Sequence, residues 1–279
     1  MNTVTYNGTP ILYTEGSSGD PTWSEKTWYG LTNFYGYSVW TDGENIYYSS
    51  GSDQYVLNKA ISTWVEKTWH GYSGLGGSNV WTDGENIYYS YGDSGAQYVL
   101  DKATSTWTAK TWNGYRYITG SRVWTDGENI YYSYDSKQYV LNKSTSTWSA
   151  KTWTGLTNFS GSDIWTDGEN IYQSNGTSQY VLNTATSTWT PKTWNGFTNI
   201  MGDYIWNDGE NIYLSRGAFD QYVLDKSTST WSAKTWEVFS SPYGNSVWTD
   251  GENIYASSGS NQYILGKTMP SRLAIYYNP

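Results

Sequence analysis

The chain has 279 residues, with 29 Tyr, 18 Trp and no Cys, and its formal net charge is −9. Without Cys there are no disulfides, thiolate nucleophiles or Cys-ligated zinc sites, and a single His (His70) excludes a metal site with several His ligands. The negative charge disfavours nucleic acid and anionic membrane surfaces as partners. No apolar run approaches the roughly 20 residues that span a bilayer, and the N-terminus does not read as a secretory leader. We therefore expect no membrane insertion, no metal and no cofactor.

An internal repeat dominates the sequence. The segment Trp-Thr-Asp-Gly-Glu-Asn-Ile-Tyr recurs every 41–43 residues, with Asn for Thr in one copy; the copies begin at Trp40, Trp81, Trp124, Trp165, Trp206 and Trp248. Each copy is followed by Gln-Tyr-Val-Leu, or by Gln-Tyr-Ile-Leu in the last one. A Thr-Trp element that ends in Lys-Thr-Trp also occurs six times, first at Trp23 and Trp28. A repeat of about 40–45 residues has the size of one propeller blade.

The first predicted element is a hairpin. Residues 4–16 align without a gap on residues 39–51, which places Asn7-Gly8 on the Asp-Gly turn of the later copies. Residues 23–28 then supply a strand that resembles the fourth strand of a repeat, although no third strand precedes it. The chain is therefore predicted to open with an incomplete repeat.

The next repeat shows the pattern of the complete copies. Residues 39–41 and 44–48 flank Asp42-Gly43, and Asp-Gly between two β-rich runs predicts a tight hairpin. Residues 54–57 and 64–69 supply a third and a fourth strand. Because no segment shows helical periodicity and both strand faces carry apolar residues, we expect an all-β propeller whose four-stranded antiparallel blades cover one another.

The end of the chain bears on the number of blades. Residues 262–277 align on residues 221–236, so residues 273–277 fill either a fourth-strand position or the missing third strand of the first blade. We favour seven blades in a single domain spanning residues 1–279, with six blades as the alternative. The repeats are predicted to begin near Val4 (incomplete), Val39, Val80, Val123, Ile164, Ile205 and Val247.

These repeats resemble kelch-type repeats, which have a Gly-turned hairpin, a Tyr-bearing third strand and a Trp at the start of the fourth. The Gly-Gly doublet that usually follows the second kelch strand is replaced here by Tyr48-Ser49-Ser50-Gly51. Near-identical repeats with variable loops are also similar to the propeller modules of phage tail proteins and of lectins. The resemblance implies a β-propeller that acts in recognition on a virion or an extracellular surface.

Comparison of the repeats with one another predicts which face binds. In a four-stranded blade, the first and third turns lie on one face of the disc, and the second turns and the links between blades lie on the other. The first face is nearly constant, whereas the links vary; they cover residues 29–38, 70–79, 113–122, 154–163, 195–204 and 237–246. All 18 Trp occupy repeated positions, while all five Phe and three of the four Arg occupy variable loops. A constant frame with diversified loops on one side is typical of binding scaffolds.

We therefore predict a non-enzymatic recognition module that binds a cell-surface ligand, with a glycan as the first choice of ligand. The predicted ligand-binding residues are Tyr115, Arg116, Tyr117, Arg122, His70, Tyr72, Asn158, Phe159, Asp163, Phe197, Asn199 and Tyr204. The first alternative is a structural or protein-docking propeller in a larger assembly, such as a virion.

The second alternative is a glycoside-active enzyme, which would need a pair of carboxylates. The non-repeated acids of the variable face are Asp53, Asp93, Asp135, Asp163, Asp203 and Asp220, with Glu237 nearby. No motif singles out a pair among them, so no catalytic residue is predicted.

Overall fold

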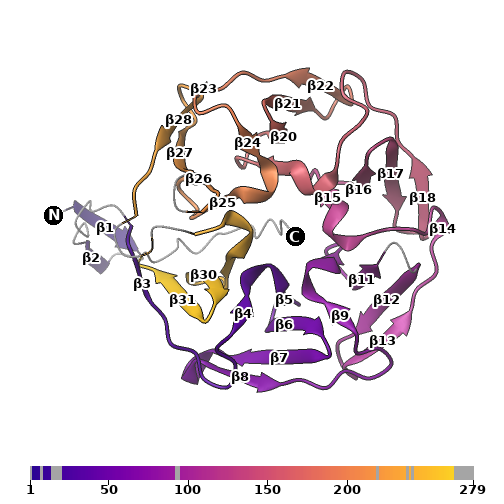
Figure 1. Ribbon diagram of the computed structural model, residues 1–279, viewed down its shortest axis with the longest axis horizontal. Coiled ribbons are helices and arrows are strands. Elements are labelled where there is room, and N and C mark those ends of the chain that lie inside the picture. Colours follow the sequence, from indigo (N-terminus) through magenta and orange to yellow (C-terminus); the bar gives the residue numbers. More distant parts are fainter. Residues whose placement is uncertain are drawn as a thin grey trace.

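The short runs of Val, Ile, Thr, Tyr and Trp are strands in the computed structural model, and the Asp-Gly and Ser-Thr segments between them are turns. The structure describes residues 21–91, 95–217, 220–236, 239 and 242–266, together with the backbone of strands β1 (Asn2–Tyr6) and β2 (Thr9–Tyr13). Six sheets stand around a central axis, which confirms an all-β propeller of antiparallel blades (Figure 1).

Each blade contains four antiparallel strands, called A to D from the axis outward. Blade 1 consists of β5 (Val39–Thr41), β6 (Ile46–Gly51), β7 (Asp53–Asn58) and β8 (Thr63–Glu66). Blade 2 consists of β10 (Val80–Thr82), β11 (Ile87–Tyr91), β12 (Ala96–Asp101) and β13 (Thr106–Ala109). Blade 3 consists of β15 (Val123–Thr125), β16 (Ile130–Tyr134), β17 (Lys137–Asn142) and β18 (Thr147–Ala150).

The second half of the ring repeats this order. Blade 4 consists of β19 (Ile164–Thr166), β20 (Ile171–Gly176), β21 (Ser178–Asn183) and β22 (Thr188–Pro191). Blade 5 consists of β25 (Ile205–Asn207), β26 (Ile212–Ser215), β27 (Gln221–Asp225) and β28 (Thr230–Ala233). Blade 6 consists of β29 (Val247–Thr249), β30 (Ile254–Gly259), β31 (Asn261–Leu265) and, as its D strand, β3 (Trp23–Glu25).

The links between blades carry short elements of their own. Three of them pair with the B strand of the preceding blade: β4 (Phe34–Tyr35), β9 (Leu75–Gly76) and β24 (Ile200–Met201). Two pair in parallel with the D strand of the following blade: β14 (Asn113–Gly114) and β23 (Asn195–Gly196). Each link ends in a 3-10 turn just before strand A: η1 (Gly36–Ser38), η3 (Gly77–Asn79), η4 (Gly120–Arg122), η5 (Gly161–Asp163), η6 (Gly202–Tyr204) and η7 (Gly244–Ser246). A further turn, η2 (Lys59–Ile61), joins β7 to β8.

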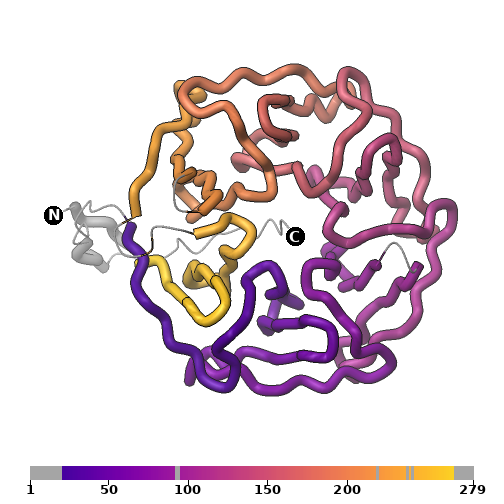
Figure 2. The backbone as a smooth tube through the Cα atoms, viewed as in Figure 1, coloured from indigo at the N-terminus to yellow at the C-terminus, as the bar shows by residue number. Residues whose placement is uncertain are grey.

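The ring closes through an early segment of the chain. Strand β3 pairs antiparallel with β31, with Trp23 opposite Leu265 and Glu25 opposite Tyr263, so the early and late parts of the described chain lie side by side (Figure 2). The favoured count of seven blades is therefore wrong, and six is correct. Residues 23–25, which the sequence assigned to an incomplete first blade, complete the last one. Strands β1 and β2 pair only with each other, and the predicted strand at residues 273–277 lies outside the described residues.

Aromatic side chains fill the space between neighbouring blades. At the junction of blades 1 and 2, the Trp40 ring lies 4.5 Å from that of Tyr47 and 5.8 Å from that of Trp69. Trp107, on the D strand of blade 2, meets Trp40 at 6.0 Å in an edge-on arrangement. The Trp40 indole also donates a 2.9 Å hydrogen bond to the Ser49 hydroxyl, and the bond recurs in every blade. The repeated Trp are thus core residues.

The first prediction concerns the role of strand β3 in closing the ring. Removing residues 1–26 deletes the D strand of blade 6 and takes Trp23 away from Trp206 and Trp236, both within 6 Å of it. We expect this variant to lose cooperative thermal unfolding, measured by near-UV circular dichroism. Removing only residues 1–20 leaves all six four-stranded sheets intact and should preserve the transition. Equal behaviour of the two variants would contradict closure by β3.

A second prediction concerns the repeated Trp. Trp124 is 8 % exposed and donates a 2.9 Å hydrogen bond to Ser133, so Trp124→Ala should lower the free energy of unfolding by about 3–5 kcal/mol in urea titrations. Trp124→Phe should cost less because most of the ring is kept. Tyr29→Ala, at a side chain that is 62 % exposed, should change it by less than about 0.5 kcal/mol.

Candidate functional site

The two faces of the ring are distinguished by contacts. Lys102, in the C–D turn of blade 2, donates a 2.6 Å hydrogen bond to the carbonyl of Asp42, in the A–B turn of blade 1. Lys143 makes the same bond to Asp83 one blade further on. The A–B and C–D turns therefore share one face, called the turn face. Strand β9 pairs with the far end of β6, so the links lie with the B–C turns on the opposite face, called the link face.

The repeated acids of the turn face are bound within their own turns. Asp42 accepts hydrogen bonds from the backbone N–H of Glu44 and Asn45, at 3.0 and 2.7 Å, and from the Tyr47 hydroxyl at 3.0 Å. Burial alone would raise the pKa of Asp42, but these hydrogen bonds hold it below its ordinary value. The equivalent carboxylates of blades 2, 3 and 4 behave alike. The Asp-Gly-Glu-Asn turn is thus a structural unit.

Each link is fastened to its blade by a buried Gln from strand C. The Gln97 amide donates to the carbonyl of Ile118 at 3.1 Å and to that of Arg116 at 3.3 Å. The Gln of every other blade binds a link carbonyl in the same way. Because the contacts are made to backbone carbonyls, the anchor does not restrict which side chains the link carries.

Two positions of each link belong to the core. The first packs on the third-strand Tyr, and the Tyr115 ring lies parallel to Tyr139 at 4.2 Å. Tyr72 and Phe197 stack in the same way on Tyr98 and Tyr222. The second position is buried in all six links, where it holds Phe34, Leu75, Ile118, Phe159, Ile200 and Pro242. Phe159, expected to be a ligand contact, is 4 % exposed and packs against Trp189 at 5.3 Å. The expectation of accessible Phe platforms in the links is therefore not met at these positions.

The six 3-10 turns form a ring around the axis on the link face. A Cβ atom added to Gly120 would lie 2.1 Å from the carbonyl oxygen of Asn79, in the turn of the neighbouring blade, and the other five turns repeat this contact. The ring surrounds one end of an axial cavity of about 530 Å³, whose wall comes mainly from the A strands. At the link face the cavity is lined by Gly36, Tyr37, Asp203, Gly244 and Asn245. We call this end the mouth.

The remaining predicted contact residues do not gather at one place. Arg116, Tyr117, Asn158 and Asn199 are exposed on the links, whereas exposed His70 pairs through its backbone with Thr106 on the rim of the ring. The Arg122 guanidinium lies 3.6 Å from the centre of the Tyr134 ring, so its charge is already engaged in a cation–π contact within the protein.

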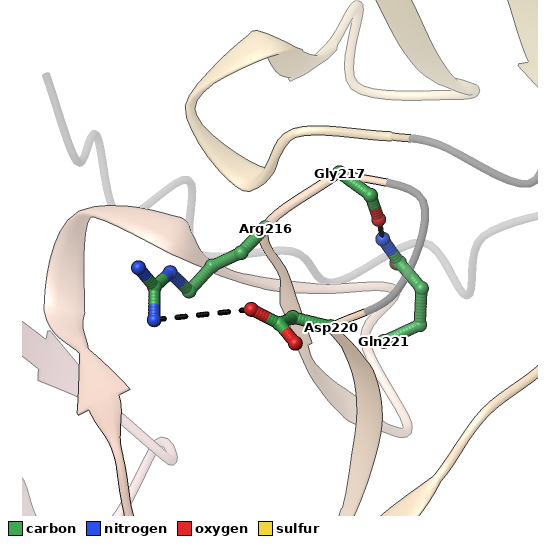
Figure 3. Close-up of polar contacts among 4 residues, drawn as sticks. All are labelled: Arg216, Gly217, Asp220 and Gln221. Carbon is green, nitrogen blue, oxygen red and sulfur yellow. Dashed lines mark hydrogen bonds and ion pairs between the residues drawn. The ribbon is translucent and has the colours of Figure 1, made fainter.

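Blade 5 presents a second aromatic group beside the mouth. Tyr204 lies 6.4 Å from Tyr243 and 5.4 Å from the Arg216 guanidinium. Arg216 is 3.9 Å from the Asp220 carboxylate, and Gln221 binds the carbonyl of Gly217 across the same turn (Figure 3). A Cβ atom on Gly217 would lie only 3.0 Å from the Tyr243 hydroxyl. Glycine at this position therefore allows the Tyr243 side chain to pack against the B–C turn of blade 5.

Two carboxylates meet at the junction of blades 4 and 5. Burial, together with the neighbouring charge of Asp203, raises the pKa of Asp163 to about 6. Burial also raises the pKa of Asp203, although the charge of Arg216 opposes the shift. No motif in the sequence pairs these residues, because they belong to different repeats. In the described part of the chain, no three His, Asp or Glu side chains gather closely enough to hold a metal ion.

Sequence reasoning missed four of the exposed aromatics of the link face, Tyr35, Tyr37, Tyr91 and Tyr243, and found only Tyr117. Tyr35 and Tyr37 stack on each other at 5.4 Å. A signal was present in the sequence: the positions on either side of the 3-10 glycine vary freely among repeats, whereas the stacking and core positions stay aromatic or aliphatic. Variation at the level of single positions, rather than of whole loops, separates surface from core.

No protein-family model matches the chain, and no curated protein matches its sequence. Among solved structures it is similar to the extracellular domain of the putative hybrid two component system BT3049 from B. thetaiotaomicron, with a TM-score of 0.51, 13 % identity, and coverage of 94 % of this chain and 36 % of that one. The extracellular domain of BT4673 from the same organism matches with a TM-score of 0.49, 11 % identity, and coverage of 86 % and 34 %. The chain thus spans about a third of the length of these structures. At such identities the likeness shows the fold alone. Of the helices in the described residues, none has the length and apolar character to cross a membrane.

A third prediction follows from the raised pKa of Asp163. A carboxyl whose pKa rises from 3.8 to about 6 on folding binds its proton more tightly in the folded state, so ionising it costs stability as the pH rises through that interval. The free energy of unfolding at pH 7 should therefore be higher for Asp163→Asn than for the wild type. The difference should be on the order of 1–2 kcal/mol, after allowance for partial exposure. The difference should vanish at pH 4. Glu128→Gln, at an exposed acid, serves as the control in urea titrations at both pH values. A constant difference across pH would contradict the assignment.

Proposed function

We propose that the chain is a non-enzymatic recognition module that binds a carbohydrate on a cell or virion surface through the link face. The observation that carries this proposal is the concentration of exposed tyrosines there. Tyr35, Tyr37, Tyr91, Tyr117 and Tyr243 are between 45 % and 56 % exposed; four of them lie on links, and Tyr91 ends strand β11 at the link face. The other large apolar or aromatic side chains exposed in the described residues are three: Ile61 on the turn face, Val65 on a D strand, and Tyr29 on the rim, where its backbone bonds to Ser62 of a C–D turn.

Tyrosine has the chemistry that a sugar requires. Its ring offers an apolar face to the C–H groups of a pyranose, and its hydroxyl forms hydrogen bonds with the hydroxyls at the sugar edge. A core of this size does not need exposed aromatics, and large exposed aromatic surfaces usually mark binding sites. The module is accordingly suited to an uncharged, hydroxyl-rich ligand.

Charge favours a neutral glycan over an acidic one. The net charge is −9, and of the link-face arginines within the described residues, Arg122 and Arg216 are engaged with Tyr134 and Tyr204. Arg116 is exposed, but a single guanidinium gives little selectivity for an acidic sugar against this overall charge.

The fold is compatible with exposure outside a cell. The B. thetaiotaomicron structure with a TM-score of 0.51 is the extracellular domain of a putative hybrid two component system. The Asp163–Asp203 pair would act as a hydrogen-bond acceptor for ligand hydroxyls. Docking to a protein in a larger assembly and cleavage of a glycoside are the competing outcomes of the test below.

The fourth prediction tests the proposal with a glycan array that contains neutral and acidic glycans. The wild type should bind neutral glycans, and Arg116→Ala combined with Tyr117→Ala should leave the urea midpoint within experimental error because both side chains are exposed. A variant with Tyr35→Ala, Tyr37→Ala and Tyr243→Ala should weaken binding of the array hits at least tenfold, about 1.4 kcal/mol.

The matched control is Glu128→Gln, an exposed acid on the turn face, which should leave affinity intact. Asp126 is unsuitable as a control because its carboxylate holds the turn. Absence of binding to every glycan overturns the proposal, as does loss of binding in the control but not in the tyrosine variant. Release of reducing sugar from a bound glycan would assign the enzymatic alternative.

A further inference from the structure

The mouth of the axial cavity is not six-fold symmetric. Every link places one residue before the glycine of its 3-10 turn and one directly after it. On three consecutive links these two positions hold Met201 and Asp203, Tyr243 and Asn245, and Tyr35 and Tyr37. On the other three links they hold Gly76 and Ser78, Thr119 and Ser121, and Ser160 and Ser162. Larger side chains therefore flank the 3-10 glycines on one half of the ring of links, and small side chains flank them on the other half.

The cavity reflects this division. Its lining at the mouth comes entirely from the links with large residues: Gly36, Tyr37, Asp203, Gly244 and Asn245. The links at residues 76–79, 119–122 and 160–163 are fully described and contribute no lining residue. The two halves differ in side-chain size, whereas the backbone of the six 3-10 turns repeats the same contact around the axis. The asymmetry is thus carried by side chains on a symmetric frame.

On the half of the mouth with the larger side chains, Tyr37 is the aromatic residue that lines the cavity. Its ring is 45 % exposed, lines the cavity and is supported from behind by Tyr35 at 5.4 Å and 20° between the ring planes. A ring held by a second ring presents its free face without loss of rotamer freedom on binding. Asn245, exposed on the adjacent link, offers an amide donor and acceptor, and the partly buried Asp203 offers a carboxylate acceptor.

We propose that each ring has one saccharide-binding site, at the large-residue half of the mouth, with Tyr37 as its stacking platform and Asn245 and Asp203 as its hydrogen-bonding groups. This inference rests on the proposed function and adds the place, the stoichiometry and the kind of sugar. A pyranose lies with its apolar face on Tyr37 and directs hydroxyls toward Asn245 and Asp203. The serine half of the mouth leaves room for the ligand to extend outward.

Size and charge agree with a neutral mono- or oligosaccharide. The whole axial cavity, which runs from the mouth to the A–B turns of the turn face, has a volume of about 530 Å³, and small-molecule sites typically have roughly 300–1,000 Å³. An anionic sugar would meet the Asp203 carboxylate and its neighbour Asp163, and no lining residue is basic. One site per ring also differs from what six identical repeats would supply, because none of the three side chains recurs at its equivalent position.

The test is isothermal titration of the full chain with lactose, cellotriose, maltotriose and mannotriose. We expect at least one of these neutral sugars to bind with a stoichiometry near one per chain. Tyr37→Ala should weaken that binding at least tenfold, whereas Tyr37→Phe should weaken it by less than fivefold because the platform is retained. Circular dichroism checks that both variants keep the wild-type thermal midpoint.

Tyr29→Ala is the matched control, because Tyr29 is 62 % exposed but lies on the rim, where it contacts the next blade through its backbone. Its affinity should equal that of the wild type. A stoichiometry near six, unchanged affinity in Tyr37→Ala, or no heat with any of the four sugars overturns the single neutral site. If the array still shows glycan binding in that case, the proposed function stands without this site. If the glycan array also shows no binding, both the proposed function and the single saccharide site are wrong.

Discussion

Neighbouring blades depend on one another because each sheet is apolar on both faces. A four-stranded sheet with Trp and Tyr on both sides is stable only when another sheet covers each side, and closure into a ring covers all of them at once. The contacts cross blade boundaries: Trp69, from the link that leaves blade 1, lies 5.9 Å from Trp107 on blade 2. Strand β3 brings Trp23 into the same arrangement between blades 5 and 6. Without it, the last junction would be open to water.

The repeated polar residues serve the same frame. The Asp of each A–B turn is held by backbone N–H groups, and the Gln of strand C holds a link carbonyl. Lys67, after strand D, binds the hydroxyl of Ser105 at 2.7 Å on the following blade, and Ser105 has a left-handed backbone conformation with φ of 53°. Because the Asp carboxylate, the Gln amide N–H groups and the Lys ammonium are engaged within the frame, they are not available to a ligand. Functional groups must therefore come from positions that differ among repeats.

The repeat period predicted the strands, the hairpins and the division into two faces, because these depend on local pattern. The blade count failed where a local alignment competed with a non-local pairing. The sequence of residues 4–16 resembles a hairpin and precedes Trp23, but the D strand that begins at Trp23 pairs with the strand that ends at Leu265, near the other end of the chain. The sequence contains six A–B hairpins with Trp, six Gln-Tyr strands and six D strands. These equal numbers indicate six complete blades, and they predict the blade count better than the local alignment does. In the links, the aromatic residues were correctly assigned to the link face, but pattern alone could not separate Tyr115, which packs on Tyr139, from Tyr117, which is exposed.

Divergence among the links has a physical basis at the axis. Six copies of one side chain around the axis would crowd if they were large and would repel one another if they were charged. Burial is the main cause of the raised pKa of Asp163, and the charge of Asp203 adds to it. A ligand smaller than the mouth also cannot contact six equivalent groups at once, so identical copies would add no affinity. A strong contact on one side, such as the Tyr35–Tyr37 stack, is compatible with binding only if the opposite side is kept small. In the site that we propose, tyrosine on one half of the mouth and serine on the other let a symmetric scaffold hold a single asymmetric molecule.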